Sequence, residues 1–265
     1  MPIEQVHGLG VIVTTLGMFI LVVALELFWP ARAALVPVAP RWRVNGALYA
    51  MNFALVFAAP ISAFGVAIAA NANGFGLFQW FELGDGPWVV FSAWLVLDLS
   101  LYLLHLAYHR LPWLWRLHRT HHADADFDIS TGVRFHPLET VVTVAYRSAV
   151  AALLGPPLIA MLVHELLIIA FGFYTHGNLR VPTRADRLLR LVLVTPPMHS
   201  IHHSVEPGEG GSNLGGVLSI WDRLFGTYVA QPAAGQSGLR FGLADLPAAI
   251  RLRDLLVLPF RARPA

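Results

Sequence analysis

The sequence predicts an all-α integral membrane protein of about four transmembrane or re-entrant helices with a cytoplasmic helical cap. Three observations support this prediction. Hydrophobic residues make up 56% of the 265 residues and charged residues only 13%, and the mean hydropathy is +0.60. Several apolar runs reach the roughly 20 residues that a helix needs to cross a bilayer core. The chain also contains 12 histidines, an unusual number among so few polar groups.

The composition excludes several classes of protein. A soluble domain is usually about 25% charged, so a free cytosolic globule is excluded, as is intrinsic disorder. The absence of cysteine excludes disulfide scaffolds, thiolate zinc sites, chain-held iron–sulfur clusters and cysteine nucleophiles. All 18 basic residues are arginine, and they are scattered with a net charge of only +2. We therefore expect no nucleic-acid partner.

Three apolar segments are predicted to be transmembrane helices: residues 9–28, 46–70 and 87–108. The first has Glu26 as its only charge, the second has none, and the third has Asp98. We interpret the first segment as a span rather than a secretory signal, because no Arg or Lys precedes it.

A fourth apolar region, residues 141–175, is predicted to form a helical hairpin. The tripeptide Gly155-Pro156-Pro157 divides it and is a strong turn signal. The hairpin either spans the membrane or re-enters it, and in both cases its two ends lie on the same side.

The placement of arginine predicts the orientation. The connection 30–45 contains three arginines and no acid, whereas the connection 71–86 contains two acids and no base. Positive residues favour the cytoplasmic side. We therefore expect residues 30–45, 110–139 and those after 176 to be cytoplasmic, in an inner or plasma membrane.

We predict a single membrane domain over residues 1–265. Its parts are N-terminal transmembrane helices (1–97), a histidine-rich region (98–228) and a cytoplasmic or interfacial tail (229–265). Within the tail, residues 246–260 mix apolar groups with charge, which is typical of a segment at a membrane surface.

Eight of the histidines form three clusters with helical spacing. Residues three and four apart share a helix face, so each cluster is expected to direct its imidazoles at one point. Imidazole binds Fe, Zn, Cu or Ni, and this repetition favours metal ligation over isolated structural histidines or a proton relay. The clusters are His105 and His109; His118, His121 and His122; and His199, His202 and His203.

Two further histidines join the candidate ligands. His136 lies where the hairpin begins and His176 where it ends. Eight to ten imidazoles are too many for one ion, so we predict a dimetal site with four or five nitrogens for each ion. His7 and His164 are interpreted as structural; His164-Glu165 begins like a metalloprotease motif, but residue 168 is Ile.

The surroundings of the clusters suggest supporting residues. Asp98 lies seven residues before His105 on one stripe of the third span, with Tyr102 between them. We expect its carboxylate to accept from a free ring N–H of a ligand histidine. The glycine-rich residues 208–216 lack the flanking features of a phosphate loop and are predicted to form a tight loop over the metal site.

These motifs, taken together and in order, resemble the fatty acid hydroxylase and sterol desaturase superfamily of integral membrane proteins. The resemblance covers about residues 98–228. It includes Asp98-x3-Tyr102-x2-His105-x3-His109-Arg110, His118-x2-His121-His122, Arg134-x-His136-Pro137-x-Glu139, His176-x-Asn178, Thr195-Pro-Pro-Met-His199-x2-His202-His203-Ser204 and Trp221-Asp222-Arg223-Leu-Phe225-Gly226-Thr227-Tyr228.

The resemblance implies a non-haem di-iron centre on the cytoplasmic face that uses O2 and two electrons to hydroxylate or desaturate a lipid C–H bond. It implies ten ligands and the supporting residues Asn178 and Asp222. Zinc could replace iron in a purified sample, because imidazole binds both. The ligands would be His105, His109, His118, His121, His122, His136, His176, His199, His202 and His203.

The chain has no electron-carrier motif, so a separate donor such as a ferredoxin, a rubredoxin or a b-type cytochrome with its reductase is expected. Two alternatives from other classes are a histidine-rich metal or proton transporter and a zinc-dependent lipid hydrolase. The sequence leaves open the lipid substrate, the choice between hydroxylation and desaturation, and the oligomeric state.

Overall fold

The computed structural model describes residues 1–261, so the last four residues of the predicted tail lie outside it. Over this range the fold is helical, with isolated β-bridges and no strand, which confirms the all-α prediction. The α-helices are α1 (Ile3–Phe28), α2 (Val38–Ala58), α3 (Ala63–Ala72), α4 (Leu77–Trp80), α5 (Pro87–Arg110), α6 (Pro112–His122), α7 (Pro137–Leu154), α8 (Leu158–His176), α9 (Thr183–Leu189), α10 (Pro196–His202), α11 (Ile220–Leu224) and α12 (Leu252–Val257). Three 3-10 helices, η1 (Ile129–Val133), η2 (Gln236–Gly238) and η3 (Leu258–Phe260), complete the set.

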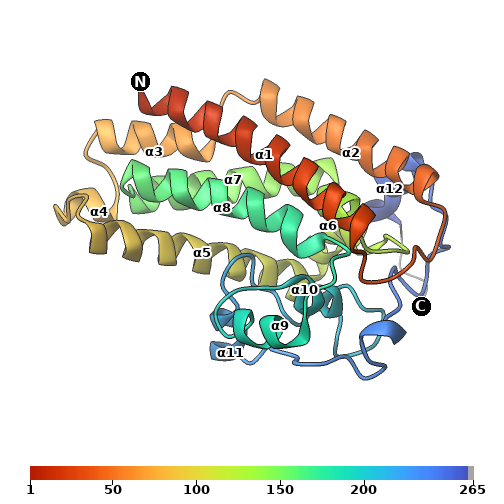
Figure 1. Ribbon diagram of the computed structural model, residues 1–265. Coiled ribbons are helices and arrows are strands. Elements are labelled where there is room, and N and C mark those ends of the chain that lie inside the picture. The colour runs from red at the N-terminus through yellow and green to blue at the C-terminus, as the bar shows by residue number, and fades with distance from the viewer. Residues whose placement is uncertain (262–265) are drawn as a thin grey trace.

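The long helices lie alongside one another, and the short helices α9, α10 and α11 gather at one end (Figure 1). Five segments are long and apolar enough to cross a membrane: α1, α2 to α4 taken together, α5, α7 and α8. This is one more than predicted, because each arm of the hairpin qualifies by itself.

The predicted second span is interrupted. The sequence suggested one helix over residues 46–70, but α2 ends at Ala58 and α3 begins at Ala63. Pro60 lies in the gap, and a proline removes a backbone donor and clashes with the preceding turn, so the helix stops there. The Ser62 side chain then caps α3 by accepting from Gly65 N at 3.1 Å.

The predicted hairpin is confirmed as α7 and α8. Gly155 ends α7 with φ of 54°, and a Cβ there would lie 2.2 Å from the Phe75 carbonyl oxygen. Only glycine meets both conditions. The starts of α7 and α6 and the end of α8 therefore lie at the same end of the bundle (Figure 1).

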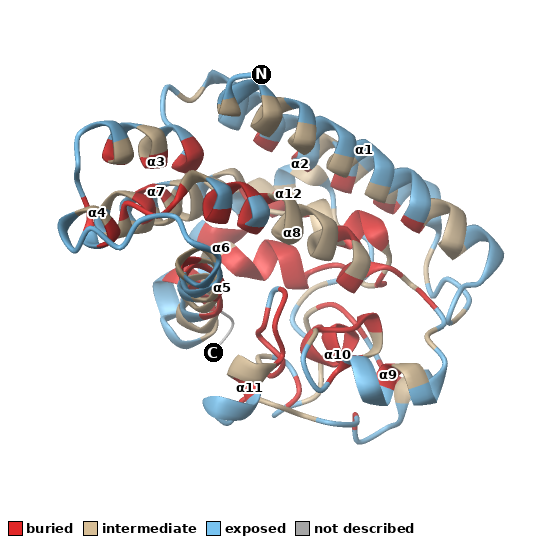
Figure 2. Cartoon of the chain, turned by 60° about the vertical axis from the view of Figure 1, so that its left-hand side comes forward, coloured by how far each residue is buried: buried red, intermediate tan, exposed pale blue. Residues whose placement is uncertain are grey.

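The outer helices expose apolar side chains. Val13 and Ile20 of α1 are 60% and 65% exposed. Buried residues instead concentrate in α6, α10 and the loops beside them (Figure 2). Exposed apolar surface of this extent is expected where lipid tails cover a helix. The outer helices thus expose apolar side chains, whereas the end of the bundle that contains the histidines is densely buried.

Ion pairs fasten the α1–α2 connection and the first turn of α2 to the segment that follows α6. Arg32 Nη1 lies 2.6 Å from Asp126 Oδ1, and Arg41 Nη2 lies 2.5 Å from Asp128 Oδ2. Arg41 Nε also lies 2.8 Å from Asp124 Oδ1. Two of the arginines that predicted the orientation thus also position the loop before α7.

The tail returns to the same end of the molecule. Leu255 and Leu258 are buried with Leu48 of α2 and Ala123, directly after α6. Residues 246–260, predicted for the membrane surface, therefore pack with these side chains against the protein itself.

Candidate metal centre

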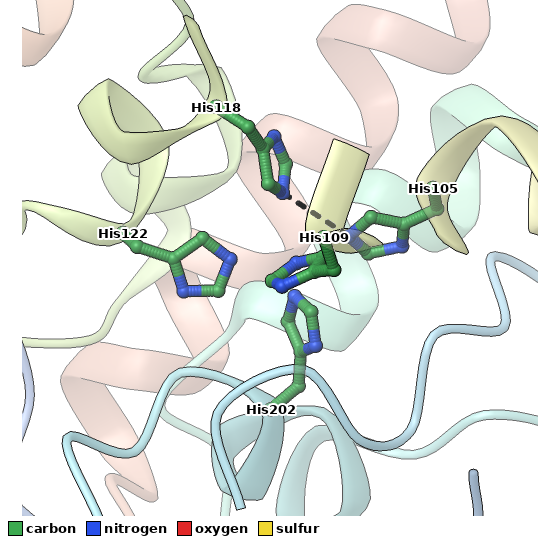
Figure 3. A group of neighbouring side chains, drawn as sticks. All are labelled: His105, His109, His118, His122 and His202. Carbon is green, nitrogen blue, oxygen red and sulfur yellow. Dashed lines mark hydrogen bonds between the residues drawn. The ribbon is translucent and has the colours of Figure 1, made fainter. Parts of the chain in front are cut away.

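Nine of the ten candidate ligands converge into two groups. In each group one nitrogen from every ring lies within 4.8 Å of the others. Figure 3 shows the rings of the first group directed at a common point. The five-histidine group is His105, His109, His118, His122 and His202. The four-histidine group is His121, His176, His199 and His203.

The structure divides the sequence clusters between the two groups. We expected each cluster to converge on one point, but His118 and His122 join one group while His121 joins the other. Likewise His202 belongs to the five-histidine group, whereas His199 and His203 belong to the four-histidine group. Pairs four residues apart stay together because they share a helix face, whereas adjacent residues point about 100° apart. The spacing that looked like one site therefore serves two.

Short helices bring the clusters together. α5 ends at Arg110, and Pro112 starts α6 as its first residue. This proline cannot continue α5, so the chain turns and α6 packs against it. α10 starts after Thr195, whose hydroxyl accepts from Met198 N at 3.4 Å.

Burial keeps the rings neutral. His118, His121 and His122 are each no more than 3% exposed. Burial lowers the pKa of each well below its ordinary value, with neighbouring histidines as the next cause. The pKa values of His199, His202 and His203 are lowered in the same way. A neutral imidazole carries a lone pair, which is what a metal ligand needs.

The hydrogen bonds of the five-histidine group direct lone pairs inward. His105 Nδ1 donates to the Leu214 carbonyl at 2.8 Å, and His118 Nδ1 lies 2.6 Å from Glu139 Oε1. In neutral rings both Nε2 atoms then carry lone pairs, yet they face each other at 3.2 Å (Figure 3). Two ligands about 2.0–2.1 Å from one ion lie roughly 2.9–3.4 Å apart. The arrangement fits a cation between the rings.

The four-histidine group has the same property. His176 Nδ1 donates to the Gly172 carbonyl at 2.8 Å, which leaves its Nε2 as an acceptor. That atom lies 3.2 Å from His121 Nε2 and 3.0 Å from His199 Nε2. Nε2 of His203 is buried and has no hydrogen-bond partner among the described residues. These nitrogens also fit a metal ion.

The structure does not place His136 in either group, which corrects the sequence prediction. Its Nδ1 accepts from Leu138 N at 3.1 Å, and its Nε2 donates to the Leu256 carbonyl at 3.1 Å. Both ring nitrogens are therefore engaged. His136 caps α7 and fastens the tail, and has no lone pair left for an ion.

Asp98 and Tyr102 do not contact the histidines in the expected way. Asp98 Oδ2 accepts from Trp221 Nε1 at 2.8 Å, whereas His105 uses a backbone carbonyl. The Tyr102 hydroxyl lies 2.9 Å from Thr227 Oγ1. Both residues therefore attach the segment around α11 to α5, since their side chains lie on the side of α5 that this segment covers.

Asp222 acts on the site through that segment. Its carboxylate accepts from Leu214 N at 2.6 Å and from Gly215 N at 3.0 Å. Leu214 in turn offers its carbonyl to His105. Burial raises the pKa of Asp222, against the effect of these hydrogen bonds. Asp222 thus fixes a loop that orients a histidine.

Asn178 fastens the chain directly after His176. Its side-chain nitrogen donates to the Arg32 carbonyl at 2.9 Å, and its oxygen accepts from Arg32 N at 3.2 Å. It therefore ties the end of α8 to the α1–α2 connection.

The glycine-rich segment lies over the histidines as predicted. A Cβ on Gly211 would lie 3.2 Å from His109 Nδ1. The Ser212 carbonyl accepts from His202 Nδ1 at 2.8 Å. Glycine allows the backbone to approach the rings closely enough to serve as a hydrogen-bond acceptor.

Sequence reasoning gave no role at the centre to two residues, Glu139 and Phe127, although Glu139 lies in one of the quoted motifs. Glu139 is 2% exposed and pairs with His118; an acid in the first turn of an apolar helix needs a partner, and this was the available signal. Phe127 packs on the four-histidine group, with its ring centroid 5.1 Å from that of His203. No sequence pattern marked Phe127.

An apolar chamber of about 190 Å³ adjoins both groups. α5, α7, α8 and the 214–216 loop form its walls. It exposes His105 and His118 of one group and His121, His176 and His199 of the other. A molecule in the chamber would therefore meet both candidate ion positions.

Comparison with known proteins agrees with this geometry. Residues 90–227, about half of the chain, match the family model described as fatty acid hydroxylase. The chain belongs to the fatty acid hydroxylase family. The matched region contains all nine histidines of the two groups, and the resemblance inferred from the motifs is confirmed.

Several curated relatives are similar to this family member. Alkylglycerol monooxygenase from Homo sapiens is 32% identical over 56% of this chain and 32% of its own length. The enzyme of that name from Xenopus tropicalis is 29% identical over 71% of this chain and 42% of its length. Ornithine lipid hydroxylase OlsE from Rhizobium tropici is 34% identical over 52% of this chain and 40% of its length. The chain thus spans less than half of each of these relatives, and no solved structure matches it.

Proposed function

We propose that this protein is an O2-dependent di-iron oxygenase that hydroxylates a C–H bond of a membrane lipid. The observation that carries the proposal is the pair of histidine groups facing one apolar chamber. The family and the relatives named as lipid hydroxylases or monooxygenases support it. They favour hydroxylation over desaturation.

The reaction consumes one O2, two electrons and two protons, and converts R–H into R–OH with release of water. Bound iron would supply the reduction of O2 and the removal of the hydrogen atom. The nine histidines of the two groups would hold the two ions, and with five and four nitrogens each ion can keep a position for O2.

The chain's own residues perform three tasks. Glu139, Leu214 and Ser212 accept from Nδ1 of three histidines and so keep each Nε2 lone pair directed inward. The apolar walls exclude water from the reacting carbon. They also position the lipid, so that geometry selects the C–H bond.

The membrane setting and the electron donor are parts of the proposal. The three arginines of residues 30–45 lie in or beside the α1–α2 connection, at the histidine end of the bundle, which supports a cytoplasmic face. Because the described residues present no redox cofactor motif, electrons would come from a separate ferredoxin, rubredoxin or b-type cytochrome.

Comparative lipid mass spectrometry tests the proposal. Cells expressing the wild type should accumulate a lipid heavier by one oxygen, and ¹⁸O2 should label it. His202→Ala should abolish the product, while His136→Gln serves as a matched histidine control and should keep it. A product that also forms without O2 would indicate a hydrolase, and metal uptake into vesicles without a modified lipid would indicate a transporter.

A further inference from the structure

The chamber is too small to enclose a whole lipid. Pockets that bury a complete small molecule usually measure about 300–1,000 Å³. The 190 Å³ here lies below this range. The chamber therefore accepts a segment of a substrate whose remainder stays outside.

Gly172 lies at the centre of the α8 face that lines this chamber. The lining residues of α8 are Ile168, Gly172, Thr175 and His176, which are spaced three and four apart and so share one face. Gly172 is one helical turn from His176 on this face. A Cβ built on Gly172 meets no atom within 4 Å, so the added group would enter open space.

The backbone does not explain this glycine. Gly172 has ordinary helical geometry inside α8, where alanine would be more stable. Its neighbour across the helix interface is Gly132, which approaches the Gly172 carbonyl rather than its Cα. The absence of a side chain at Gly172 therefore matters inside the chamber, where it leaves room beside His176.

The opposite wall offers little to a polar substrate. Leu101 and Leu104 of α5 are apolar, and the Tyr108 hydroxyl is 2.8 Å from Thr143 Oγ1. These two hydroxyls satisfy each other. An alkyl chain can pack on these side chains without burying an unpaired hydroxyl.

We propose that Gly172 sets the width of the chamber, so that a slim unbranched alkyl chain, and not a fused-ring lipid, reaches the histidines. The inference rests on the proposed function for the reaction that follows binding. Any side chain at position 172 would narrow the passage one turn from His176.

Photolabelling in vesicles tests whether Gly172 sets the width of the chamber, and it does not rely on turnover. The probe is a phosphatidylcholine with a diazirine in a hexadecyl chain, and peptide mass spectrometry locates the label. Wild type should be labelled at Leu104 or Ile168. Gly172→Leu should lose about tenfold or more of this labelling, because the leucine side chain would occupy the space that the alkyl chain needs. Gly17→Leu is the matched control on the exposed face of α1 and should behave as wild type.

Gly172→Ala covers the case in which the leucine variant fails to fold. It should melt above wild type, because alanine is the better helix former, and yet lose about half of the labelling. Unlabelled alkyl lipid should compete for the site and excess sterol should not. Full labelling in both variants, or equal competition by sterol, would overturn the inference.

The two proposals fail separately. If labelling responds as expected but wild-type cells form no oxygenated lipid, the proposed function is wrong, whereas the role of Gly172 in setting the width of the chamber is supported. If the oxygenated lipid forms while labelling ignores position 172, only the role of Gly172 is wrong.

Discussion

The two histidine groups differ in how firmly their rings are held. In the five-histidine group, three Nδ1 atoms have fixed partners: a carbonyl for His105, a carboxylate for His118 and a second carbonyl for His202. In the four-histidine group, Nδ1 of His121 and of His199 is buried without a partner among the residues described. Partners on the outer nitrogen raise ligand basicity and restrict the ring. We infer a preorganised ion position beside a more adaptable one.

The largest expected effects come from removing one ligand in each group. His202→Ala and His203→Ala should each lower oxygenated lipid by about 100-fold or more, because ligand loss exceeds the 10–100-fold cost of losing a supporting partner. Metal analysis should show that His203→Ala still retains one ion per chain. Equal loss of both ions in the two variants would contradict the difference between the groups.

Glu139 should affect only the preorganised group. Glu139→Ala should weaken metal binding there by about 10–100-fold. Glu139→Gln should cost less, because its amide oxygen can still accept from His118. Titration of the metal-free protein with Fe(II) measures both variants. An unchanged first affinity in Glu139→Ala would show that His118 does not need its partner.

Metal removal should proceed in two steps. A chelator should empty the four-histidine group first and the five-histidine group later. The melting temperature should fall in both steps, because an ion at 100 times its dissociation constant stabilises a fold by about 2.7 kcal/mol. Calorimetry alongside metal analysis follows the steps. Simultaneous loss of both ions would mean that the two sites are equivalent or strongly coupled.

The smallest expected effect is at Asp222. The two carboxylate oxygens of Asp222 accept from Leu214 N and Gly215 N. Asp222→Asn replaces one of these oxygens with an amide nitrogen, which leaves one of the two backbone N–H groups without an acceptor. The unsatisfied buried group should cost about 1–3 kcal/mol of unfolding free energy. Denaturant unfolding measures this cost. A variant as stable as wild type would show that the loop does not depend on Asp222.

The sequence predicted most of the fold because long apolar runs and helix breakers are local signals. The long apolar helices, the hairpin at Gly155 and the nine candidate ligands that converge follow from such signals. The prediction of one helix over residues 46–70 rested on the absence of charge and did not consider Pro60, a local helix breaker.

What the sequence could not predict depends on tertiary contacts. The division of two of the three clusters between the two histidine groups requires knowing which neighbours each helix face meets. His136 was predicted as a ligand because nothing in the sequence marks its real contacts. Its ring nitrogens bind the backbone N of Leu138 and the backbone carbonyl of the distant Leu256. The backbone carbonyls that orient His105, His176 and His202 carry no side-chain signal at all.

Metal stoichiometry on protein purified without oxygen tests the central claim most directly. Iron and protein should be quantified on the same sample, with His136→Gln as the matched control. The account predicts about two iron ions per chain for both, because two separate groups of imidazoles converge. A single ion per chain, or none after reconstitution with Fe(II), would contradict it.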